Sequence, residues 1–528
     1  MDRSVIIRVN YILFRNIQKL KHMKTNKLAI SALAMMISLS VCAQTSFDAA
    51  KLYEEELNGT ARYVAMGGAM GALGSDPSVI SHNPAGIGTY HQSDINFSLG
   101  FFGTSVNTDP LATSANQLFA NGRTYYSHND KSDVNVSFDN FAAVFSGSES
   151  GDIYFNFGIA YRKLQNMDRS LDYVDSFLDA DGYEVWREYR DNQRNKIHSW
   201  DFNLSCNLSD MVYFGWTVGI LSTDTWSEGY FYDYYGADMH PDYPLGLDYT
   251  AVDKMNQSEG AGWNMAFGTI IRPIPALRLG AAIKTPTYYR QRLEYADYLY
   301  AFEGTQYRTV YDEVNREYVA TTYTMDDVAA MQAAGNDVGG EVEKFNNSVD
   351  YKFSSPWTLN LSAGLTIGKT AFGAEYERHF TQRSSLSIGN TEMNNQGAKD
   401  YKDYSTIKFG VEQNIGNLSL RAGYNLTGSM FKDDAIPFLG DSEFNAGKPG
   451  DMGRTDFQID RLGKTRNCTC GIGYCSAPDR DGTQFYIDLA YVHGVRNSVV
   501  NVNEYFEDRD VDYKYKTDKV LLTIGWNF

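Results

Sequence analysis

The sequence has little of what defines helical membrane proteins, disulfide-built proteins or nucleic-acid-binding proteins. Cysteine occurs five times and proline twelve times in 528 residues. The mean hydropathy is −0.40, which excludes a bundle of transmembrane helices, because each helix would need about 20 consecutive apolar residues. There are 47 basic residues against 65 acidic ones, whereas a surface that binds phosphates needs clustered Lys and Arg. We therefore expect no nucleic acid as a partner.

One uncharged stretch, Leu28 to Ala43, follows Lys24 and Lys27 and is typical of a secretory signal. We expect residues 1–43 to be a signal peptide, with residues 1–22 an extension upstream of a start at Met23. Lipidation of Cys42 is a less favoured alternative, because the residue before it is too large for that signal. The remaining 485 residues (528 − 43) have 40 basic and 64 acidic side chains, a net charge of −24.

The composition favours strands, since aromatic residues make up 14% of the chain and glycine occurs 46 times. From residue 94 onward apolar side chains alternate with polar or small ones, as in Leu359, Leu361 and Leu365 against Asn360 and Ser362. Fourteen segments of this kind are predicted strands: 94–104, 134–146, 152–164, 197–208, 211–222, 260–272, 276–289, 357–367, 370–380, 404–415, 418–429, 465–476, 482–494 and 512–528.

Short connections, such as Ser209-Asp210, Gly368-Lys369 and Gly416-Asn417, alternate with long polar ones. The long connections are predicted at 105–133, 165–196, 223–259, 290–356, 381–403, 430–464 and 495–511. An even number of antiparallel strands with this asymmetry is typical of an outer-membrane barrel. Closure follows because hydrocarbon offers no hydrogen-bond partner to a free strand edge. We predict an all-β fold, a 14-stranded antiparallel transmembrane β-barrel over residues 94–528.

The last predicted strand ends the chain at Phe528, with Trp526 on the same face. This ending resembles the carboxy-terminal signal that the barrel assembly machinery recognises, so that machinery is an expected partner. No metal is expected. The spacing of Cys468, Cys470 and Cys475 matches no zinc pattern, Cys206 is isolated, and the acidic run 504–512 is interpreted as a solvated loop rather than a calcium site.

The segment before the first strand, residues 44–93, is rich in glycine and alanine and is predicted to form a compact plug in the barrel mouth. Pro77 should begin a short helix capped by Ser75 or Asp76, and Pro84 should end it near His82. A nucleotide-binding loop is excluded, because the glycines lack the required spacing after a strand and no Walker lysine is present.

Three elements of this segment stand in order before an alternating strand: Ala65-Met66-Gly67-Gly68-Ala69, Ser75-Asp76-Pro77-Ser78 and Asn83-Pro84-Ala85-Gly86. Together they resemble the amino-terminal hatch of FadL-type long-chain fatty-acid transporters, the outer membrane protein transport family. The resemblance implies a hatch over residues 44–93, whose gating residues would be Gly67, Gly68, Asn83, Pro84, Ala85 and Gly86.

The resemblance further implies passive diffusion of hydrophobic compounds, most of all long-chain fatty acids, across the outer membrane of a Gram-negative bacterium. Such a protein would lie among outer-membrane lipid and lipopolysaccharide. In the family the solute leaves sideways beside a kinked third strand, for which Gly158 is the candidate here. External loops three and four correspond to 223–259 and 290–356, and Thr324 to Ala334 is a candidate helix in the latter.

Lumen-facing cations are candidates for binding a fatty-acid carboxylate. By strand alternation they are Arg162, Arg278, Lys284, Lys408 and Arg421. The alternative for each is a lumen ion pair, with Glu375, Glu412 or Asp488 as partners.

Two other functions stay open, a barrel shuttle in protein secretion and a hemin receptor. Heme would need axial His or Tyr, and the histidines after residue 43 show no close pairing along the sequence: His82, His91, His128, His198, His240, His379 and His493. An enzyme is not expected and no catalytic residue is assigned, because no nucleophile motif accompanies His379 or His493. No cofactor is expected.

Overall fold

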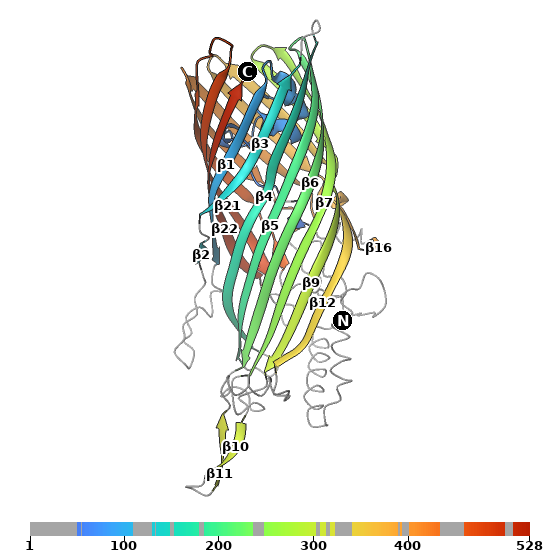
Figure 1. The fold of residues 1–528 in the computed structure, drawn as a ribbon, viewed down its shortest axis with the longest axis vertical. Helices are drawn as coiled ribbons and strands as arrows, with labels where there is room; N and C mark the ends of the chain where they lie inside the picture. The colour runs from blue at the N-terminus through green and yellow to red at the C-terminus, as the bar shows by residue number, and fades with distance from the viewer. Residues whose placement is uncertain are drawn as a thin grey trace.

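The computed structural model shows a closed 14-stranded antiparallel β-barrel, which confirms the predicted fold (Figure 1). Closure is made by the first and last strands, which pair from Asp94 opposite Asn527 to Thr108 opposite Tyr513. The structure describes residues 50–53, 55–108, 129–131, 134–147, 153–178, 184–235, 248–302, 307–312, 317–322, 340–388, 391–392, 401–432, 459–501 and 510–528.

The strands of the barrel follow one another around the ring in chain order. They are β1 (Asp94–Thr108), β3 (Asn135–Ser146), β4 (Ile153–Leu178), β5 (Glu184–Leu208), β6 (Val212–Tyr235), β7 (Asp248–Ile274), β8 (Leu277–Lys284) with β9 (Tyr288–Phe302), β12 (Gly340–Ser354) with β13 (Thr358–Ile367), β14 (Thr370–His379), β17 (Tyr404–Ile415), β18 (Leu418–Thr427), β20 (Thr465–Cys475), β21 (Gln484–Asn501) and β22 (Asp510–Asn527). Short strands are β2 (Asn129–Lys131), β10 (Tyr307–Asp312), β11 (Glu317–Thr322), β15 (Ser385–Ile388), β16 (Thr391–Glu392) and β19 (Ile459–Arg461).

The two faces of the barrel wall differ as the alternation predicted. On β13, Leu361 points outward and is 47% exposed, whereas Asn360 points into the lumen and is 3% exposed. The same contrast separates the outward Phe155 and Phe157 from the buried Asn156 on β4. Apolar side chains therefore face the lipid, and polar ones face the lumen.

The short connections are tight turns at one end of the barrel, which we call the turn end; the other is the long-strand end. Ser209 and Asp210 adopt positive φ values of 53° and 55°, and Gly368 and Gly416 have φ of 60° and 64°. These left-handed positions let two-residue turns join neighbouring strands without splaying them. The chain end lies here too, since the backbone amide of Phe528 bonds to the carbonyl of Ser93 at 2.9 Å.

The predicted long loops were partly wrong, because several of them continue as strands. β4 runs on to Leu178 and β5 begins at Glu184, so much of 165–196 is paired. The same holds for parts of 223–259, 290–356, 495–511 and 105–133. Beyond the ends of the predicted strands, apolar and polar residues no longer alternate regularly, while the backbone hydrogen bonds of the sheet continue.

One predicted strand, 276–289, is in fact two, β8 and β9, separated at Pro286, and Pro356 likewise separates β12 from β13. Proline has no N–H to give to the sheet, so the ladder stops at both positions. The two breaks are tied together by backbone bonds, since Ser355 N donates to Thr287 O at 3.1 Å.

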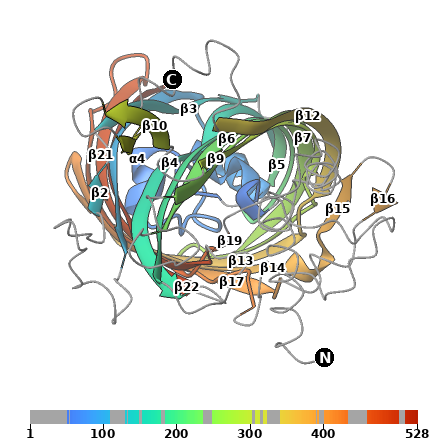
Figure 2. The same ribbon diagram turned by 90° about the horizontal axis from the view of Figure 1, so that it is seen from below.

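The glycine-rich segment lies within the ring of strands, where Figure 2 shows its helices in blue. Its elements are α4 (Ala61–Ala65), η1 (Pro77–Ser81) and η2 (Pro84–Thr89), and a further turn, η3 (Thr381–Arg383), follows β14. Asp76 caps η1 through a bond from Ser78 N, and η1 ends before His82, as predicted. We call residues 59–93 the plug, and residues 50–53 and 55–58 the strap.

No helix in the part of the chain that the structure describes is long and apolar enough to cross a membrane. The predicted signal peptide, residues 1–43, and the predicted helix Thr324 to Ala334 lie outside the described residues. The hatch boundary at residue 44 lies outside them as well.

We expect an arginine to destabilise the outward face in a depth-dependent way. Leu361→Arg, in the middle of β13, should lower the free energy of unfolding by about 2–4 kcal/mol, and Ile367→Arg, beside the turn at Gly368, by about 0–1 kcal/mol. Guanidinium unfolding in lipid vesicles, followed by tryptophan fluorescence, measures both. Equal losses at the two positions would contradict a lipid-facing wall.

Candidate functional site

A row of glycines on the lumen wall receives the plug. Gly364, Gly373, Gly410 and Gly423 are register partners on the consecutive strands β13, β14, β17 and β18. A methyl group on these glycines would overlap the plug: at Gly364 it would lie 2.7 Å from the Leu73 side chain, and at the other three it would meet the plug backbone. The wall therefore lets the plug backbone approach closely only because these side chains are missing.

Polar contacts fix the plug laterally. Arg62 donates from Nε and Nη2 to the two Glu412 carboxylate oxygens, at 2.9 and 3.0 Å. The same carboxylate accepts from Arg421 Nε at 2.6 Å, and Arg421 also pairs with Asp488. The predicted ion-pair alternative for Arg421 is thus confirmed. The sequence did not predict that Arg62 binds the same carboxylate, because 350 residues separate Arg62 from Glu412 in the chain.

Wall hydroxyls and a carboxylate satisfy backbone groups of the plug. Thr523 Oγ1 accepts from the Ala61 amide at 2.7 Å, and Thr469 Oγ1 donates to the Ala65 carbonyl at 2.9 Å. Glu375 Oε2 accepts from the Gly71 amide at 2.8 Å. The plug has no sheet of its own, so its buried backbone N–H and C=O groups need hydrogen-bond partners on the wall.

The Asn-Pro-Ala-Gly element forms the start of η2 and is fully enclosed. Asn83 is 0% exposed; its side-chain oxygen accepts from Ala85 N at 3.3 Å, and its carbonyl accepts from Gly86 N at 2.9 Å. Asn203 on β5 donates to the Pro84 carbonyl at 3.3 Å.

Gly67 and Gly68 follow α4 with φ of 64° and 78°. These values lie in the left-handed region that favours glycine. The gating role of the six residues stays a prediction.

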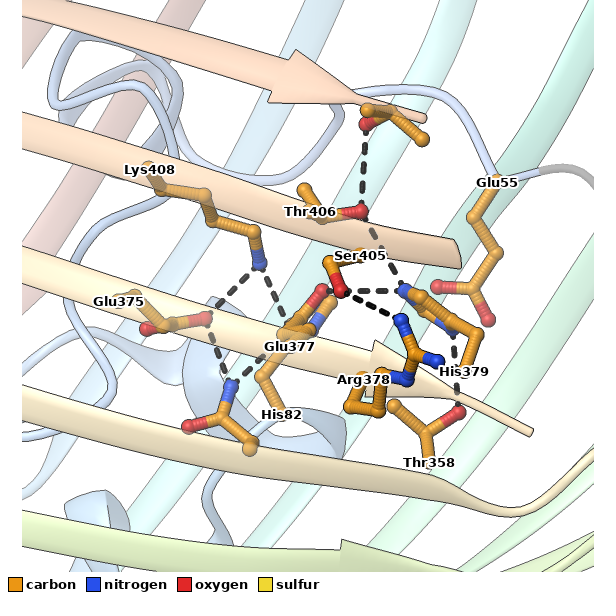
Figure 3. A network of polar contacts seen from close by, with 12 residues as sticks. Glu55, His82, Thr358, Glu375, Glu377, Arg378, His379, Ser405, Thr406 and Lys408 are labelled. Carbon is orange, nitrogen blue, oxygen red and sulfur yellow. Dashed lines mark hydrogen bonds and ion pairs between the residues drawn. The ribbon is translucent and has the colours of Figure 1, made fainter. Parts of the chain in front are cut away.

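Figure 3 shows a charged network where the plug meets β14 and β17. Lys408 Nζ lies 2.8 Å from both Glu375 and Glu377, and His82 Nδ1 lies 3.1 Å from Glu377. The ligand atoms of His82, Glu375 and Glu377 lie within 4.8 Å of one another, close enough for a metal ion. The Lys408 ammonium already bridges both carboxylates as their shared cation, which favours an ion-pair network over a metal site. The lumen ion pair predicted as the alternative role of Lys408 is present, with Glu375 as one partner.

The histidines, unpaired along the sequence, do come together here. His379 Nε2 lies 3.9 Å from Glu377, which also contacts His82. His379 is buried against Tyr53 of the strap and stacks on Tyr404, with ring centroids 4.3 Å apart. Both histidines are therefore engaged in contacts within the protein.

The strap crosses the lumen on the long-strand side of the plug. Glu55 accepts from Lys284 Nζ at 2.7 Å, and Asn58 Oδ1 accepts from Lys519 Nζ at 3.0 Å. Burial alone would raise the pKa of the Glu55 carboxyl, but the charges of Lys284, His82 and Arg162 outweigh it and lower that pKa to about 2. Glu55 is therefore held ionised beside the wall.

Leu52 of the strap inserts into an apolar patch on the lumen wall and is 3% exposed. The patch comes from strands on one side of the barrel and consists of Leu164, Ile197, Leu221, Tyr289, Leu293, Tyr351, Phe353 and Leu386. These residues were missed. They lie at or beyond the ends of the predicted strands. Apolar and polar residues do not alternate regularly there, so the sequence does not indicate which side chains point into the lumen.

A cavity with about 1620 Å³ of empty space, including the part open to solvent, lies between the strap, the plug and the wall. Its lining combines apolar side chains with charged ones, the latter being Glu55, His82, Lys284, Glu377 and Lys408. The lumen thus offers charged groups beside the apolar patch.

The remaining predicted site residues are placed as follows. Arg162 pairs with Asp201 at 2.6 Å, and Arg278 donates to the Leu73 carbonyl. β4 keeps its register through Gly158 on both sides, and its irregularity lies between Lys163 and Gln165. The kink at Gly158 stays a prediction. Cys206, Cys468, Cys470 and Cys475 are all free.

No protein-family model and no curated protein matches the chain. Solved structures do. A FadL homologue of Pseudomonas aeruginosa is 13% identical with a TM-score of 0.55 over 90% of this chain and 99% of that one. The P. putida toluene transporter TodX is 12% identical, with a TM-score of 0.50 over 90% and 99%. The deltaS2 mutant of the monoaromatic hydrocarbon channel TodX is 13% identical, with a TM-score of 0.50 over 90% and 100%. These likenesses concern the fold.

We expect a single methyl group in the glycine row to loosen the plug. Gly373→Ala should destabilise docking by about 1–3 kcal/mol, because the added carbon overlaps Ala69. The open fraction would rise about tenfold or more, seen as ion conductance in planar bilayers. Gly103→Ala is the matched control, since a methyl group there meets nothing within 4 Å. Identical conductance of the two variants would contradict close docking.

The strap should detach as the pH falls. Because the pKa of Glu55 is lowered on folding, its ionised form stabilises the docked strap above pH 4.5, and that contribution is lost between pH 4.5 and about 2. Pepsin cleavage at Leu52-Tyr53, normalised to a free peptide of the same sequence, should increase over this range. In Glu55→Gln the increase should be absent; an equal increase in the variant would contradict the assignment.

Proposed function

We propose that the protein carries hydrophobic small molecules, with long-chain fatty acids as the preferred solutes, across the outer membrane by passive diffusion through the lumen. The observation that supports this best is the apolar patch on the lumen wall around Leu52. Burying a methylene there is worth about 0.8 kcal/mol, so an acyl chain would gain several times that amount by replacing Leu52. The fold likeness to a FadL homologue and to a toluene transporter agrees with this class.

The strap resembles a fatty acid in its chemistry, because it carries an apolar group, the Leu52 side chain, and a carboxylate, that of Glu55. The acyl chain of the solute would replace Leu52, and its carboxylate would replace Glu55 at Lys284. Among the candidate cations, Arg162, Lys408 and Arg421 pair with carboxylates of the wall itself, and Arg278 bonds to the plug. Lys284 pairs with the strap instead, so we favour it as the carboxylate site.

In this proposal the plug acts as the hatch. Gly67 and Gly68 hold the turn after α4, and Asn83, Pro84, Ala85 and Gly86 hold the start of η2, so both turns must shift for a solute to pass. The contacts to be broken are mostly single hydrogen bonds, each worth about 0.5–1.5 kcal/mol. A hatch held in this way can move without unfolding the barrel.

Sideways exit is proposed at the seam between β3 and β4. These strands pair only from Asn140 opposite Arg162 to Ser146 opposite Asn156. Beyond that point β3 continues to pair with β1, and β4 with β5, but no pairing joins residues 135–139 to 163–178 among the described residues. A seam with few backbone bonds offers the least resistance to a molecule that leaves toward the lipid.

We propose outer-membrane localisation in a Gram-negative bacterium, after removal of residues 1–43, and insertion by the barrel assembly machinery through the terminal strand. The barrel fold supports this placement. A transport role rather than an enzymatic one is supported by the neighbours, which are named as a transporter and a channel. The secretion and hemin-receptor alternatives have no specific observation in their favour.

The test compares two solutes. Lys284→Met should reduce uptake of oleate by about tenfold or more, because a charge-assisted bond worth about 1.5–3 kcal/mol is lost, while uptake of toluene stays unchanged. Radiolabelled solutes and cells that express each variant provide the measurement. Lys352→Met, on the outward face of β12, is the matched control. Unchanged oleate uptake would contradict the carboxylate site, and no uptake of either solute by the wild type would contradict the proposed function.

A further inference from the structure

A carboxamide lies within the apolar patch that receives Leu52. Gln291 is 3% exposed and lies on β9 between Tyr289 and Leu293, which share its face of the strand and belong to the patch. Its register partner on β12 is Tyr351, another member of the patch. A polar group buried among apolar side chains is costly unless its hydrogen bonds are made. The hydrogen bonds of Gln291 therefore bear on what this part of the lumen can bind.

The wall holds the oxygen of this carboxamide. Gln291 Oε1 accepts from Thr223 Oγ1 at 2.8 Å and from Ser258 Oγ at 3.5 Å. The carboxamide lies over Gly260, the register partner of Gln291 on β7, where a methyl group would come within 2.5 Å of the oxygen. Because the carboxamide is planar, fixing its oxygen also fixes the direction of its NH₂ group.

The NH₂ group of the same carboxamide has no partner. Gln291 Nε2 is buried and donates to no acceptor in the part of the chain that the structure describes. A buried donor without an acceptor costs more free energy than a hydrogen bond normally contributes. On a wall that a solute must pass, such a donor is typical of a position at which the solute supplies the acceptor.

A second carboxamide of this kind lies one row further toward the long-strand end. Asn195, on β5, is 2% exposed, and its Nδ2 also lacks an acceptor among the described residues. It lines a small cavity beside Leu52, together with Leu293 of the patch. The row of register partners that begins at Asn195 ends at Leu293, two residues beyond Gln291 on β9. The apolar patch thus carries hydrogen-bond donors in two successive rows.

These donors lie far from the cation proposed for the carboxylate. Lys284 is opposite Ala266 on β7. Gln291 is opposite Gly260 on the same strand, six residues further toward the long-strand end. An interval of six residues along a strand spans about 20 Å, which only a long chain can bridge. A fatty acid with its carboxylate on Lys284 would therefore place the distal half of its chain against Gln291.

We propose that the lumen selects long-chain fatty acids that carry an oxygen, as a hydroxyl or keto group, in the distal half of the chain. That oxygen accepts from Gln291 Nε2, while the methylene groups around it pack on the apolar patch. Asn195 Nδ2 is the donor for an oxygen further along the chain. A plain hydrocarbon chain leaves both donors without an acceptor, so the site discriminates against it. This inference rests on the proposed function and adds the class of solute that the same site prefers.

The test measures the binding of stearate, 12-hydroxystearate and 2-hydroxystearate to the purified mature barrel by isothermal titration calorimetry. We expect the wild type to bind 12-hydroxystearate about tenfold more tightly than stearate, because a buried donor gains its acceptor. The 2-hydroxy isomer, whose hydroxyl lies beside the carboxylate, should bind like stearate. Gln291→Met, which keeps the shape of the side chain, should remove the preference and leave stearate binding unchanged.

Gln257→Met, on the outward face of β7, is the matched control and should keep the preference of the wild type. Heat-resistant migration on gels verifies folding of both variants, and the comparison of the three solutes in the wild type decides the proposal even without the variant. Equal binding of stearate and 12-hydroxystearate by the wild type would overturn it, as would a preference that persists in Gln291→Met. If the wild type shows the preference but cells that express it take up neither solute, the proposed function fails and the site stands.

Discussion

The structure depends on one constraint, that the hydrocarbon of a membrane accepts no hydrogen bonds. Every backbone N–H and C=O at that depth must be paired within the wall, which forces β1 onto β22 and closes the ring. Closure with this many strands leaves a lumen too wide for side chains alone to fill. The glycine-rich segment at the start of the chain fills it, and the wall accommodates that segment through its own row of glycines. The closed ring, the plug inside it and the glycines that let the two fit together all follow from the need to pair every backbone group in the membrane.

The lumen is divided into two regions with different chemistry. At the plug, contacts are polar and numerous, with Arg62, Glu412 and Arg421 forming one connected set. At the strap, Leu52 fills the apolar patch and Glu55 pairs with Lys284, while Tyr289 Oη donates to the Leu52 carbonyl at 3.0 Å. Because the strap lies on the long-strand side of the plug, a solute that enters from that side would meet the strap first.

The sequence predicted those features that have a local physical signature. Lipid imposes alternation on Leu359 and Leu361, a tight turn requires left-handed residues such as Gly368, and a buried helix start needs a cap such as Asp76. Features that depend on distant partners could not be predicted. Gln165 to Leu178 pair with β5 although apolar and polar residues no longer alternate regularly there, and Leu52 meets Leu386 only because the barrel closes. Lumen pairs were an intermediate case: alternation placed Lys408 and Glu375 inside, and the register of neighbouring strands brought them together.

The central claim is that solute passes through the lumen only when the plug moves. A disulfide between Ala61→Cys and Thr523→Cys, in a background where the four described cysteines are serine, would tie the plug to β22 at a point where the Ala61 amide and the Thr523 hydroxyl already lie 2.7 Å apart. Oleate uptake by this variant, measured before and after reduction, tests the claim most directly. The account predicts little uptake in the oxidised form and full recovery on reduction. Equal uptake in the two forms would contradict it.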